Sequence, residues 1–327
     1  MLCCLLIKWL VLTMPFFTPC NCNGIFNTHS GQTAGVIIPT ATSKVFGAFR
    51  TAGNAIYYGN ASAGSGTIIA TASNTAGAGF GANRSNTQIV IDQTLDRGYN
   101  ANGANLFRLN LDTLLQDQTQ ALINTSGFLS LDPASDRLFV GMTDGTIQVR
   151  RKSDVTVLDG TINCPGAVGN VLVYFEPSNN LLVARSGSLL TVFDTNYNVL
   201  GSVAADGNIQ SIVYCGITGT FFALGNQTSN TKEISISGKL INSFAVSIGS
   251  TYGAAYSPTS GYIYTNYFTG GVNSAQLALV NPTTRIIDKI SATAGGAGVI
   301  LAYPVYAPNK GTVYAINTDG SFAYEFN

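Results

Sequence analysis

Charged side chains are scarce in this sequence. Asp, Glu, Lys and Arg make up 10% of its 327 residues, against roughly a quarter in an average soluble domain. The 16 basic and 16 acidic residues cancel to a net charge of zero. A protein that binds nucleic acid needs a basic stripe or patch, so we expect no nucleic-acid partner. A polar but mostly uncharged surface is typical of secreted bacterial proteins and of virion proteins.

Histidine is almost missing, because His29 is the only one in the chain. A zinc site takes four ligands at suitable spacing, and His29 has no cysteine or carboxylate at such a spacing. Histidine is also the side chain that most readily exchanges protons near neutral pH. We interpret His29 as an ordinary loop residue, and we expect neither a zinc site nor catalysis by histidine.

The apolar run at the start of the chain is too short to span a membrane. Met1–Phe17 is mostly apolar, whereas a spanning helix needs about 20 apolar residues. One interpretation is a signal peptide, although no Ala-x-Ala cleavage site precedes Cys20. The other is that translation begins at Met14. We expect residues 1–19 to be an apolar leader, which is either a signal peptide or an incorrectly assigned start of the chain. Residues 20–327 should form one domain, and we expect no transmembrane helix.

One phrase recurs along the chain: a short apolar run that ends at a proline, a polar turn, and a second apolar run. Its five copies are Val36–Phe46, Leu131–Val140, Val173–Val183, Ala255–Tyr264 and Val305–Tyr314. Proline cannot donate to a sheet, so it marks a strand end or a turn, and each phrase predicts a β-hairpin. Pro133 and Pro177 lie 44 residues apart, and Pro258 and Pro308 lie 50 apart. A period in the forties with strands inside it predicts a β-propeller.

Copies without the proline fill the longer intervals and give seven units of short strands. The sequence therefore predicts an all-β fold, a seven-bladed β-propeller with four antiparallel strands per blade. The seventh unit has three strands before the chain ends, and an open sheet edge would invite aggregation. The remaining strand-like segment is Gly24–Thr28. We expect this N-terminal strand to pair with Phe322–Phe326 and close the last blade.

The repeats resemble those of a known family. Leu189–Asp194 and Leu277–Ile287 are similar to the repeats of YVTN and NHL-type seven-bladed propellers. The resemblance covers about residues 24 to 327 and implies the same ring of blades. WD40 and kelch repeats fit less well, because the chain has no Trp-Asp dipeptide and no paired-glycine kelch signature.

Six cysteines are present, and two of them fall in the leader. In the predicted blade path, Cys164 lies on the connection into the fourth blade and Cys215 ends an inner strand of the fifth blade at the opposite face. Bridged Cα atoms lie within about 7 Å of each other, so we expect these two thiols to be free. Cys20 and Cys22 could pair only with strain.

Acidic residues are rare on the predicted innermost strands, where Asp132 and Glu176 each precede a proline. Their equivalent places in adjacent blades allow a hydrolase or lyase that uses them with a metal in the channel. The alternative, which we favour, is that each carboxylate accepts backbone N–H bonds in its own turn. We expect no catalytic, cofactor-binding or metal-ligating residue. Clustered acids at Asp92–Asp96 and Asp112–Asp117 leave calcium as a weak option.

Two long loops are predicted between second and third strands, at Gln93–Gly103 and Tyr267–Ser274. Loops carry function more often than the scaffold that holds them, and exposed aromatic side chains beside amides suit glycan or protein recognition. The candidate recognition residues are Tyr99, Asn100, Asn102, Tyr267, Phe268 and Asn273.

The sequence thus predicts a non-catalytic binding or assembly module on a cell or virion surface, which recognises a glycan or a protein through these loops. One alternative is the propeller hydrolase or lyase with a channel metal. The other is a purely structural phage tail or capsid-surface protein. The expected location is extracellular or surface-associated after export, or on a virion.

Overall fold

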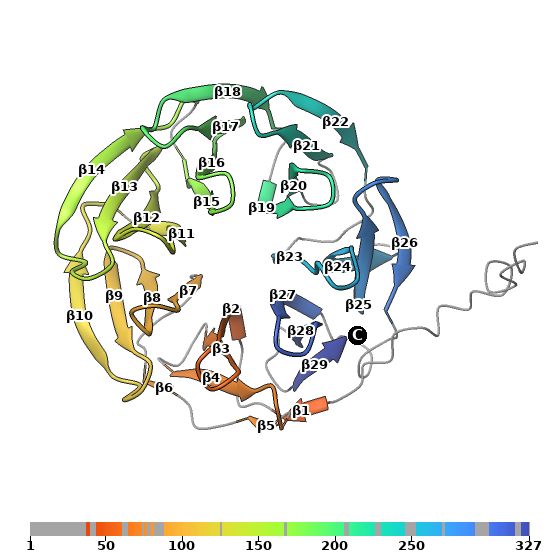
Figure 1. Ribbon diagram of the computed structural model, residues 1–327, viewed down its shortest axis with the longest axis horizontal. Helices are drawn as coiled ribbons and strands as arrows, with labels where there is room; N and C mark the ends of the chain where they lie inside the picture. The colour runs from red at the N-terminus through yellow and green to blue at the C-terminus, as the bar shows by residue number, and fades with distance from the viewer. Residues whose placement is uncertain are drawn as a thin grey trace, which may run out of the picture.

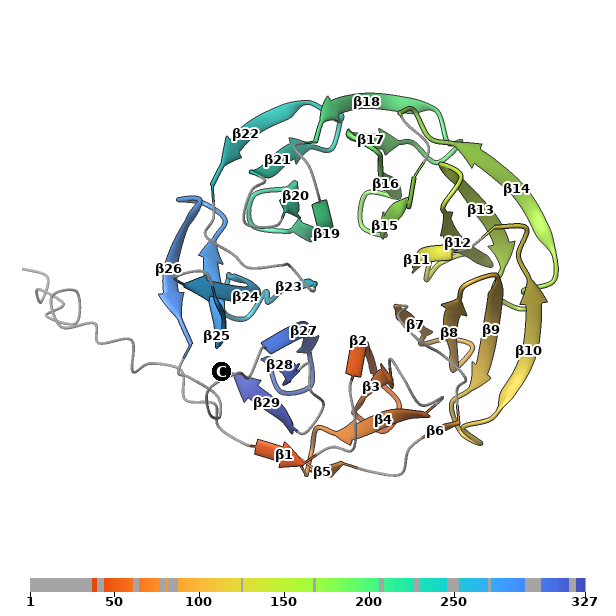
Figure 2. The same ribbon diagram turned by 180° about the vertical axis from the view of Figure 1, so that it is seen from behind.

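The computed structural model describes residues 37–39, 44–60, 65–73, 75–76, 80–81, 88–124, 126–166, 169–205, 209–225, 230–245, 253–269, 272–291, 301–317 and 322–326. These residues form strands and turns, and no helix occurs among them. Consequently no helix in the described ranges could cross a membrane. Seven antiparallel sheets stand in a ring around a central axis, as Figure 1 shows from one side and Figure 2 from the other.

Each sheet is one blade, and its strands follow one another from the axis to the outer edge of the ring. Blade 1 consists of β2 (Lys44–Arg50), β3 (Ala55–Asn60), β4 (Ser65–Ala70), β5 (Thr75–Ala76) and the additional β6 (Phe80–Gly81), which pairs with β4. Blade 2 consists of β7 (Ile89–Asp92), β8 (Arg97–Asn102), β9 (Asn105–Asn110) and β10 (Gln116–Ala121). Blade 3 consists of β11 (Ser126–Leu131), β12 (Arg137–Met142), β13 (Thr146–Arg151) and β14 (Leu158–Asn163).

Blades 4 to 7 follow the same plan. Blade 4 consists of β15 (Leu172–Glu176), β16 (Leu181–Ser186), β17 (Leu189–Phe193) and β18 (Val199–Ala204), and blade 5 of β19 (Ile209–Cys215), β20 (Thr220–Gly225), β21 (Thr231–Ser235) and β22 (Leu240–Phe244). Blade 6 consists of β23 (Ala254–Tyr256), β24 (Ile263–Thr269), β25 (Val272–Asn281) and β26 (Ile286–Ile290). Blade 7 consists of β27 (Leu301–Ala307), β28 (Thr312–Asn317), β29 (Phe322–Phe326) and β1 (Ile37–Pro39). The predicted all-β, seven-bladed propeller is confirmed.

The core lies between the blades, as strand β16 illustrates. Successive side chains of a strand point to opposite faces of the sheet. Leu181 and Val183 accordingly pack with residues of blade 5, whereas Leu182 and Ala184 pack with residues of blade 3. Because both faces of the strand are buried, its sequence is a continuous apolar run and not an alternating pattern.

The turn between the first and second strands of a blade has the same backbone shape in six blades. Its last residue, or in blade 6 the residue before the last, lies in the left-handed region, with φ between 47° and 76°, at Asn54, Asp96, Asn180, Gly219, Gly261 and Gly311. Glycine, asparagine and aspartate tolerate this conformation better than other residues. The polar turns of the repeated phrase are therefore selected by backbone geometry.

The ring is closed by an N-terminal strand, as predicted, but a different segment does so. Strand β1 pairs with β29 in the register Ile37↔Tyr324 and Pro39↔Phe322. Gly24–Thr28, the predicted closing strand, lies outside the described residues. The first phrase, Val36–Phe46, is therefore a crossing from blade 7 to blade 1 and not a hairpin within one blade. A proline at the end of a short apolar run suits an outermost strand, where no N–H is needed.

Both predicted long loops are strands, so that part of the prediction was wrong. Gln93–Gly103 contains β8, and Tyr99 at its centre is fully buried. Tyr267–Ser274 belongs to the hairpin of β24 and β25, in which Phe268 pairs with Asn273. The sequence of β8, Arg-Gly-Tyr-Asn-Ala-Asn, lacks the β-branched residues that signal strands. Packing of Tyr99 and Ala101 against blade 3 residues such as Leu138 stabilises it instead.

Candidate functional site

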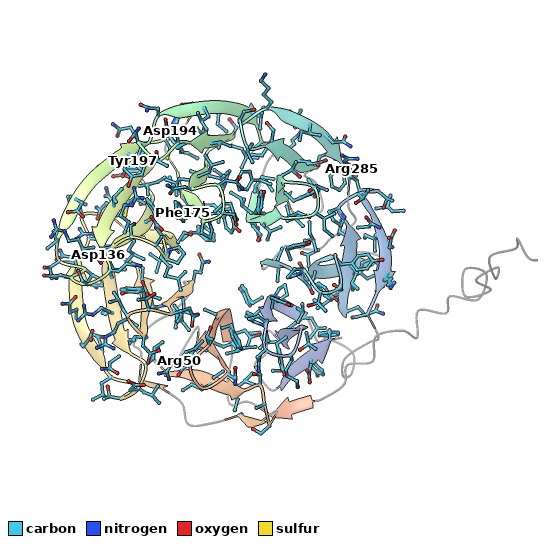
Figure 3. The ribbon with its side chains drawn as sticks, viewed as in Figure 1. Arg50, Asp136, Phe175, Asp194, Tyr197 and Arg285 are labelled. Atoms are coloured by element: carbon cyan, nitrogen blue, oxygen red, sulfur yellow. The ribbon has the colours of Figure 1, made fainter. Side chains whose placement is uncertain are left out.

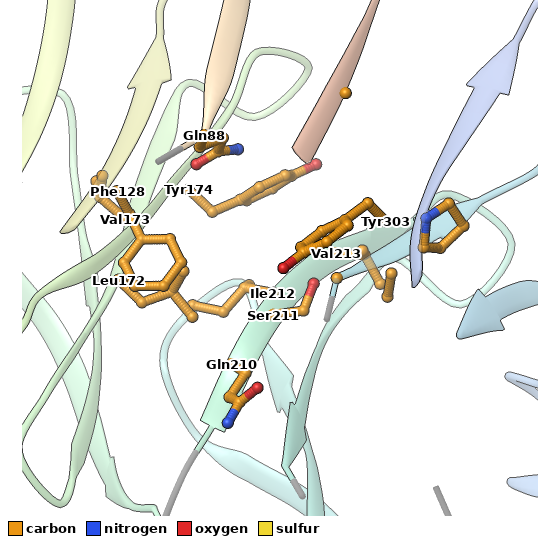
Figure 4. A pocket seen from close by; sticks show the side chains of 14 residues that line it. Gln88, Phe128, Leu172, Val173, Tyr174, Gln210, Ser211, Ile212, Val213 and Tyr303 are labelled. Atoms are coloured by element: carbon orange, nitrogen blue, oxygen red, sulfur yellow. The ribbon is translucent and has the colours of Figure 1, made fainter. Parts of the chain in front are cut away.

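A pocket of about 160 Å³ lies on the axis of the ring, and we refer to it as the axial pocket. It is lined by Gly47 of β2, Gln88 before β7, Phe128 of β11, Leu172, Val173 and Tyr174 of β15, Gln210, Ser211, Ile212 and Val213 of β19, Gly253 and Ala254 at β23, and Tyr303 and Pro304 of β27. The innermost strands of all seven blades, or residues next to them, therefore contribute to one site (Figure 4).

The lining of the axial pocket is uncharged. Its polar groups are the amides of Gln88 and Gln210, the hydroxyl of Ser211 and the phenols of Tyr174 and Tyr303. Figure 4 shows the two tyrosine rings extending toward the middle of the pocket from opposite sides. Amides and hydroxyls both donate and accept hydrogen bonds, so this lining matches a neutral ligand with donors and acceptors of its own.

Tyr303 lies in an unusual backbone conformation. Its φ is 51°, a left-handed value that is uncommon for a bulky residue. The register of β27 against β28 shifts between Ala302 and Val305, which marks a bulge at this point. Such outliers persist where the surrounding structure holds them, and they cluster at functional sites. The bulge turns the ring of Tyr303 into the axial pocket (Figure 4).

Gly47 allows β2 to approach blade 7 closely. A Cβ atom at this position would lie 2.3 Å from the ring of Tyr58 and 2.9 Å from the Cγ2 atom of Val305, which is closer than non-bonded carbon atoms approach one another. Glycine therefore sets the spacing of the inner strands of blades 1 and 7 at the edge of the pocket.

Glu176 does not line the pocket, although it ends the inner strand β15. One carboxylate oxygen, Oε1, accepts a hydrogen bond from the Ser178 backbone N–H at 2.9 Å. The other, Oε2, accepts one from the Tyr174 hydroxyl at 3.2 Å. Burial first, and then the neighbouring Glu176 carboxylate, raise the pKa of Tyr174 above its ordinary value. Tyr174 is therefore a neutral phenol at physiological pH.

Asp132, the equivalent residue of blade 3, is also held in its own turn. Its Oδ1 accepts from the Ala134 N–H at 2.9 Å, and its Oδ2 accepts from the Ser135 hydroxyl at 2.5 Å and from Arg137 at 2.8 Å. Burial alone would raise the pKa of Asp132, but these hydrogen bonds outweigh it and lower the pKa. The prediction that Asp132 and Glu176 accept bonds within their own turns is confirmed.

Asp92 is a third acid at the same place in a blade, although from the sequence we interpret it only as a member of the Asp92–Asp96 cluster. It ends β7, caps its own turn by accepting from the Thr94 and Leu95 N–H groups, and forms a buried ion pair with Lys152 of blade 3. If Ile89 is taken as the start of the first strand of blade 2, Asp92 aligns in the repeat with Asp132 and Glu176. The prediction of a loop at Gln93–Gly103 prevented this alignment.

The remaining acids of the two clusters are paired with arginines. Asp96 and Asp112 both contact Arg50, and Asp117 contacts Arg97 at 3.1 Å and Arg108 at 2.8 Å. A cation such as calcium would have to displace an arginine from each of these carboxylates. Among the residues that the structure describes, no three His, Cys, Asp or Glu side chains gather as a metal site.

Charged side chains gather instead at the face of the ring that carries the turns from first to second and from third to fourth strands. Figure 3 labels Arg50, Asp136, Asp194, Tyr197 and Arg285, and none of these lies at the axis. They link neighbouring blades or turns. The Arg137 guanidinium of blade 3 donates to the Tyr197 hydroxyl of blade 4 at 3.0 Å, and Arg285 of blade 6 pairs with buried Glu233 of blade 5 at 2.5 Å.

The predicted recognition residues do not form one surface. Tyr99 and Asn100 are buried in β8 of blade 2, and Asn102 ends the same strand. Tyr267, half-buried, packs against the core between blades 5 and 6. Phe268 and Asn273 are brought together as partners in the β24–β25 hairpin, which lies across the ring from β8 (Figure 1).

The two cysteines within the described part of the chain are free thiols, as predicted. Cys215 is buried, and Cys164 is half-buried beside the core between blades 3 and 4. Burial raises the pKa of Cys164 to about 12. Since the thiolate is the reactive form, this raised pKa makes Cys164 a poor nucleophile at neutral pH.

Comparison with solved structures identifies the fold. A chain of the "Crystal Structure of Mitotic Checkpoint Complex" superimposes with a TM-score of 0.71, over 89% of this chain and 90% of that chain, with 10% identical residues. The protein is a seven-bladed β-propeller. In all, 1684 chains of solved structures are similar, so the architecture is common and does not define a function.

Comparison at the level of sequence gives no relative. No family model matches the chain, and no curated protein is similar to it. The resemblance to YVTN and NHL-type repeats therefore stays a prediction. At 10% identity the structural likeness concerns the fold alone, which is consistent with a binding or assembly module.

Proposed function

We propose that this propeller is a non-catalytic binding module whose axial pocket takes a neutral sugar residue of a glycan. One observation carries the proposal: no residue that lines the pocket is charged, and the polar groups among the apolar lining residues come from two tyrosines, two glutamines and a serine. Hydroxyl groups of a sugar match amide and hydroxyl partners. Tyrosine rings offer apolar faces beside a polar tip, which suits an amphipathic ligand.

The state of the nearby acids supports a role without catalysis. An active site needs two or three titratable groups that converge on one point. Asp132 and Glu176 are engaged in their own turns, and neither lines the axial pocket. The raised pKa of Tyr174 keeps this phenol protonated, so it is a poor general base. Its hydroxyl hydrogen is donated to Glu176, which leaves its oxygen to accept a hydrogen bond from a ligand. A propeller hydrolase or lyase would need these acids to leave their turns.

Protein binding is the second candidate. The similar propeller comes from a complex, and propellers in general present several edges and turns to partners. This supports assembly as a function but selects no surface. A partner protein would then use an uncharged side chain at the axial pocket or a separate area of the ring.

We propose that the protein acts outside the cell or on a virion, where a purely structural role in a phage tail or capsid surface is the alternative. The low content of charged residues and the apolar segment Met1–Phe17 support this location. Mapping the first residue of the protein from culture supernatant or from purified particles tests it. Recovery of the chain only from the cell interior would argue against it.

Sugar binding can be tested by titrating the full chain with glucose and with glucuronate, two hexoses of similar size that differ in charge. We expect glucose or another neutral hexose to bind and the acidic sugar to bind at least about tenfold more weakly, because the pocket offers no cation. Gln210→Ala should weaken binding of the neutral sugar about tenfold. Thr195→Ala, an exposed turn residue away from the axis, is the matched control.

Two results would contradict the proposal. Equal binding of the neutral and acidic sugars would show that the uncharged lining does not select the ligand. If neither Gln210→Ala nor Tyr174→Phe changes the affinity for the neutral sugar, the sugar binds elsewhere on the molecule. Turnover of a glycoside by the wild-type chain, abolished in Glu176→Gln, would favour the hydrolase alternative.

A further inference from the structure

The outermost strands of blades 2 to 6 share a β-bulge near their first residue. At each bulge one residue is skipped in the pairing with the neighbouring strand. The skipped residues, in chain order, are Asp117, Asp159, Leu200, Ile241 and Asp288. The same structural position thus holds an aspartate in three blades and an aliphatic residue in blades 4 and 5.

The three aspartates have polar partners close to the bulge. Asp117 pairs with Arg108 at 2.8 Å, Asp159 pairs with Arg151 at 2.9 Å, and Asp288 accepts a hydrogen bond from Asn281 at 2.5 Å. The two aliphatic residues are instead exposed, Leu200 by 46% and Ile241 by 47%. The repeat therefore accommodates a carboxylate at this position, and blades 4 and 5 depart from it.

The exposed aliphatic residues of blades 4 and 5 are continuous with one another. The turn between β21 and β22 rests on β18, since a Cβ atom on Gly238 would lie 2.7 Å from the Cα atom of Gly201. Figures 1 and 2 show β18 and β22 following each other along the outer edge of the ring. We call this surface the rim patch. Its members, each 43% to 50% exposed, are Val199, Leu200, Ile236, Leu240 and Ile241.

The rim patch includes two strand edges that lack the usual features that prevent pairing with another chain. Sheet edges are normally blunted by charge, by proline or by being very short. In blade 1 the outermost strand, β5, has 2 residues, and in blade 7 β1 has 3 residues and ends in Pro39. Strands β10, β14 and β26 contain aspartates. By contrast, β18 (VLGSVA) and β22 (LINSF) contain neither charge nor proline.

We infer that the rim patch binds a second copy of this chain, edge strand against edge strand about a twofold axis. In such an interface the same surface is used by both copies, so a charged residue would meet its own like charge. The two edge strands have none, and the net charge of the whole chain is zero, so no long-range repulsion opposes the contact. The exposed Lys239, in the turn before β22, is the one charged residue among 199–204 and 236–244, so a strongly charged partner would find little complementary charge here. This interface lies away from the axial pocket and does not depend on sugar binding.

The test is sedimentation equilibrium of the full chain and of the double variant Leu200→Asp, Ile241→Asp. The substitutions copy what the bulges of blades 2, 3 and 6 already contain, so the fold should accept them. We expect the wild-type chain to dimerise reversibly and the double variant to dimerise at least about 100-fold more weakly, because like charges then face each other across the twofold axis. The matched control is Leu158→Asp with Ile286→Asp, which changes exposed aliphatic residues of blades 3 and 6 and should leave dimerisation unchanged.

A wild-type chain that stays monomeric at every concentration tested would overturn the inference. Dimerisation of the double variant with wild-type affinity would assign the contact to another surface and would overturn it equally. Thermal unfolding of each variant separates a loss of fold from a loss of contact. Should the double variant unfold more readily, Ala204→Lys, an exposed position on the same strand, should weaken the dimer in the same direction.

Discussion

Lys152 of blade 3 forms a buried ion pair with Asp92 of blade 2, and the two side chains are 4% and 1% exposed. The ammonium group of Lys152 also donates to the Asp132 carbonyl at 2.7 Å. The Lys152 carbonyl accepts a hydrogen bond from the Tyr99 hydroxyl at 2.9 Å. One residue therefore joins two blades through both its side chain and its backbone.

Replacing Lys152 by methionine should destabilise the protein by about 3 to 5 kcal/mol, because it leaves the buried Asp92 carboxylate without its cation. Guanidinium-induced unfolding measures the change. The double variant Asp92→Asn, Lys152→Met should recover part of the loss, since no uncompensated charge then stays buried. Arg151→Ala, which breaks an exposed pair with Asp159, is the control and should cost less than about 1 kcal/mol. Equal losses in Lys152→Met and Arg151→Ala would argue against this account.

Tyr99 should contribute to stability and not to recognition. Tyr99→Phe removes one hydrogen bond and should cost about 1 kcal/mol, whereas Tyr99→Ala opens a cavity in the core of blades 2 and 3 and should cost about 3 to 5 kcal/mol. Thermal and chemical unfolding measure both variants. A Tyr99→Ala protein that keeps wild-type stability but loses a ligand would restore the predicted recognition role.

Asp132 should make stability depend on pH in the acid range. Its pKa in the folded protein is lower than the ordinary value of 3.8, so the ionised carboxylate stabilises the fold above that value, and the contribution is lost as the pH falls through the lowered pKa. The difference in unfolding free energy between wild type and Asp132→Asn should be about 1 kcal/mol at pH 7 and should shrink toward pH 3. A difference that stays constant over this interval would mean that the charge of Asp132 is immaterial.

Ring closure should depend on Ile37–Pro39 and not on Gly24–Thr28. Deleting Ile37–Pro39 removes the partner of β29, exposes an unpaired edge and should lower the unfolding temperature by several degrees. Deleting Gly24–Thr28 should leave that temperature unchanged. The reverse result would return the closing role to the upstream segment.

Much of the fold followed from local sequence signals. Leu131–Val140 and Val173–Val183 predict hairpins in blades 3 and 4, because proline and the polar turn residues fix the chain reversal within a few positions. The repeat segment Leu189–Asp194 contains a strand in the structure, β17, which runs from Leu189 to Phe193. Asp132 and Glu176 were likewise placed correctly in their turns, since an aspartate or glutamate before such a turn bonds to nearby N–H groups.

The failures fall where contacts distant in sequence decide the outcome. Arg97–Asn102 has the composition of a loop, yet it is a strand because blade 3 covers Tyr99 and accepts a hydrogen bond from its hydroxyl. The axial pocket was not predicted either. Gly47 and Tyr303 line it together, but each is an unremarkable member of its own strand in the sequence.

The sequence by itself determined most of the strands and turns and their repetition in seven units, because hydrogen bonds in a turn and the alternation of a strand act over a few neighbouring residues. Only the tertiary structure decided which segment closes the ring, which tyrosines are buried and which side chains meet at the axis. Those outcomes depend on the burial of surfaces between blades, and that burial is set by residues far apart along the chain.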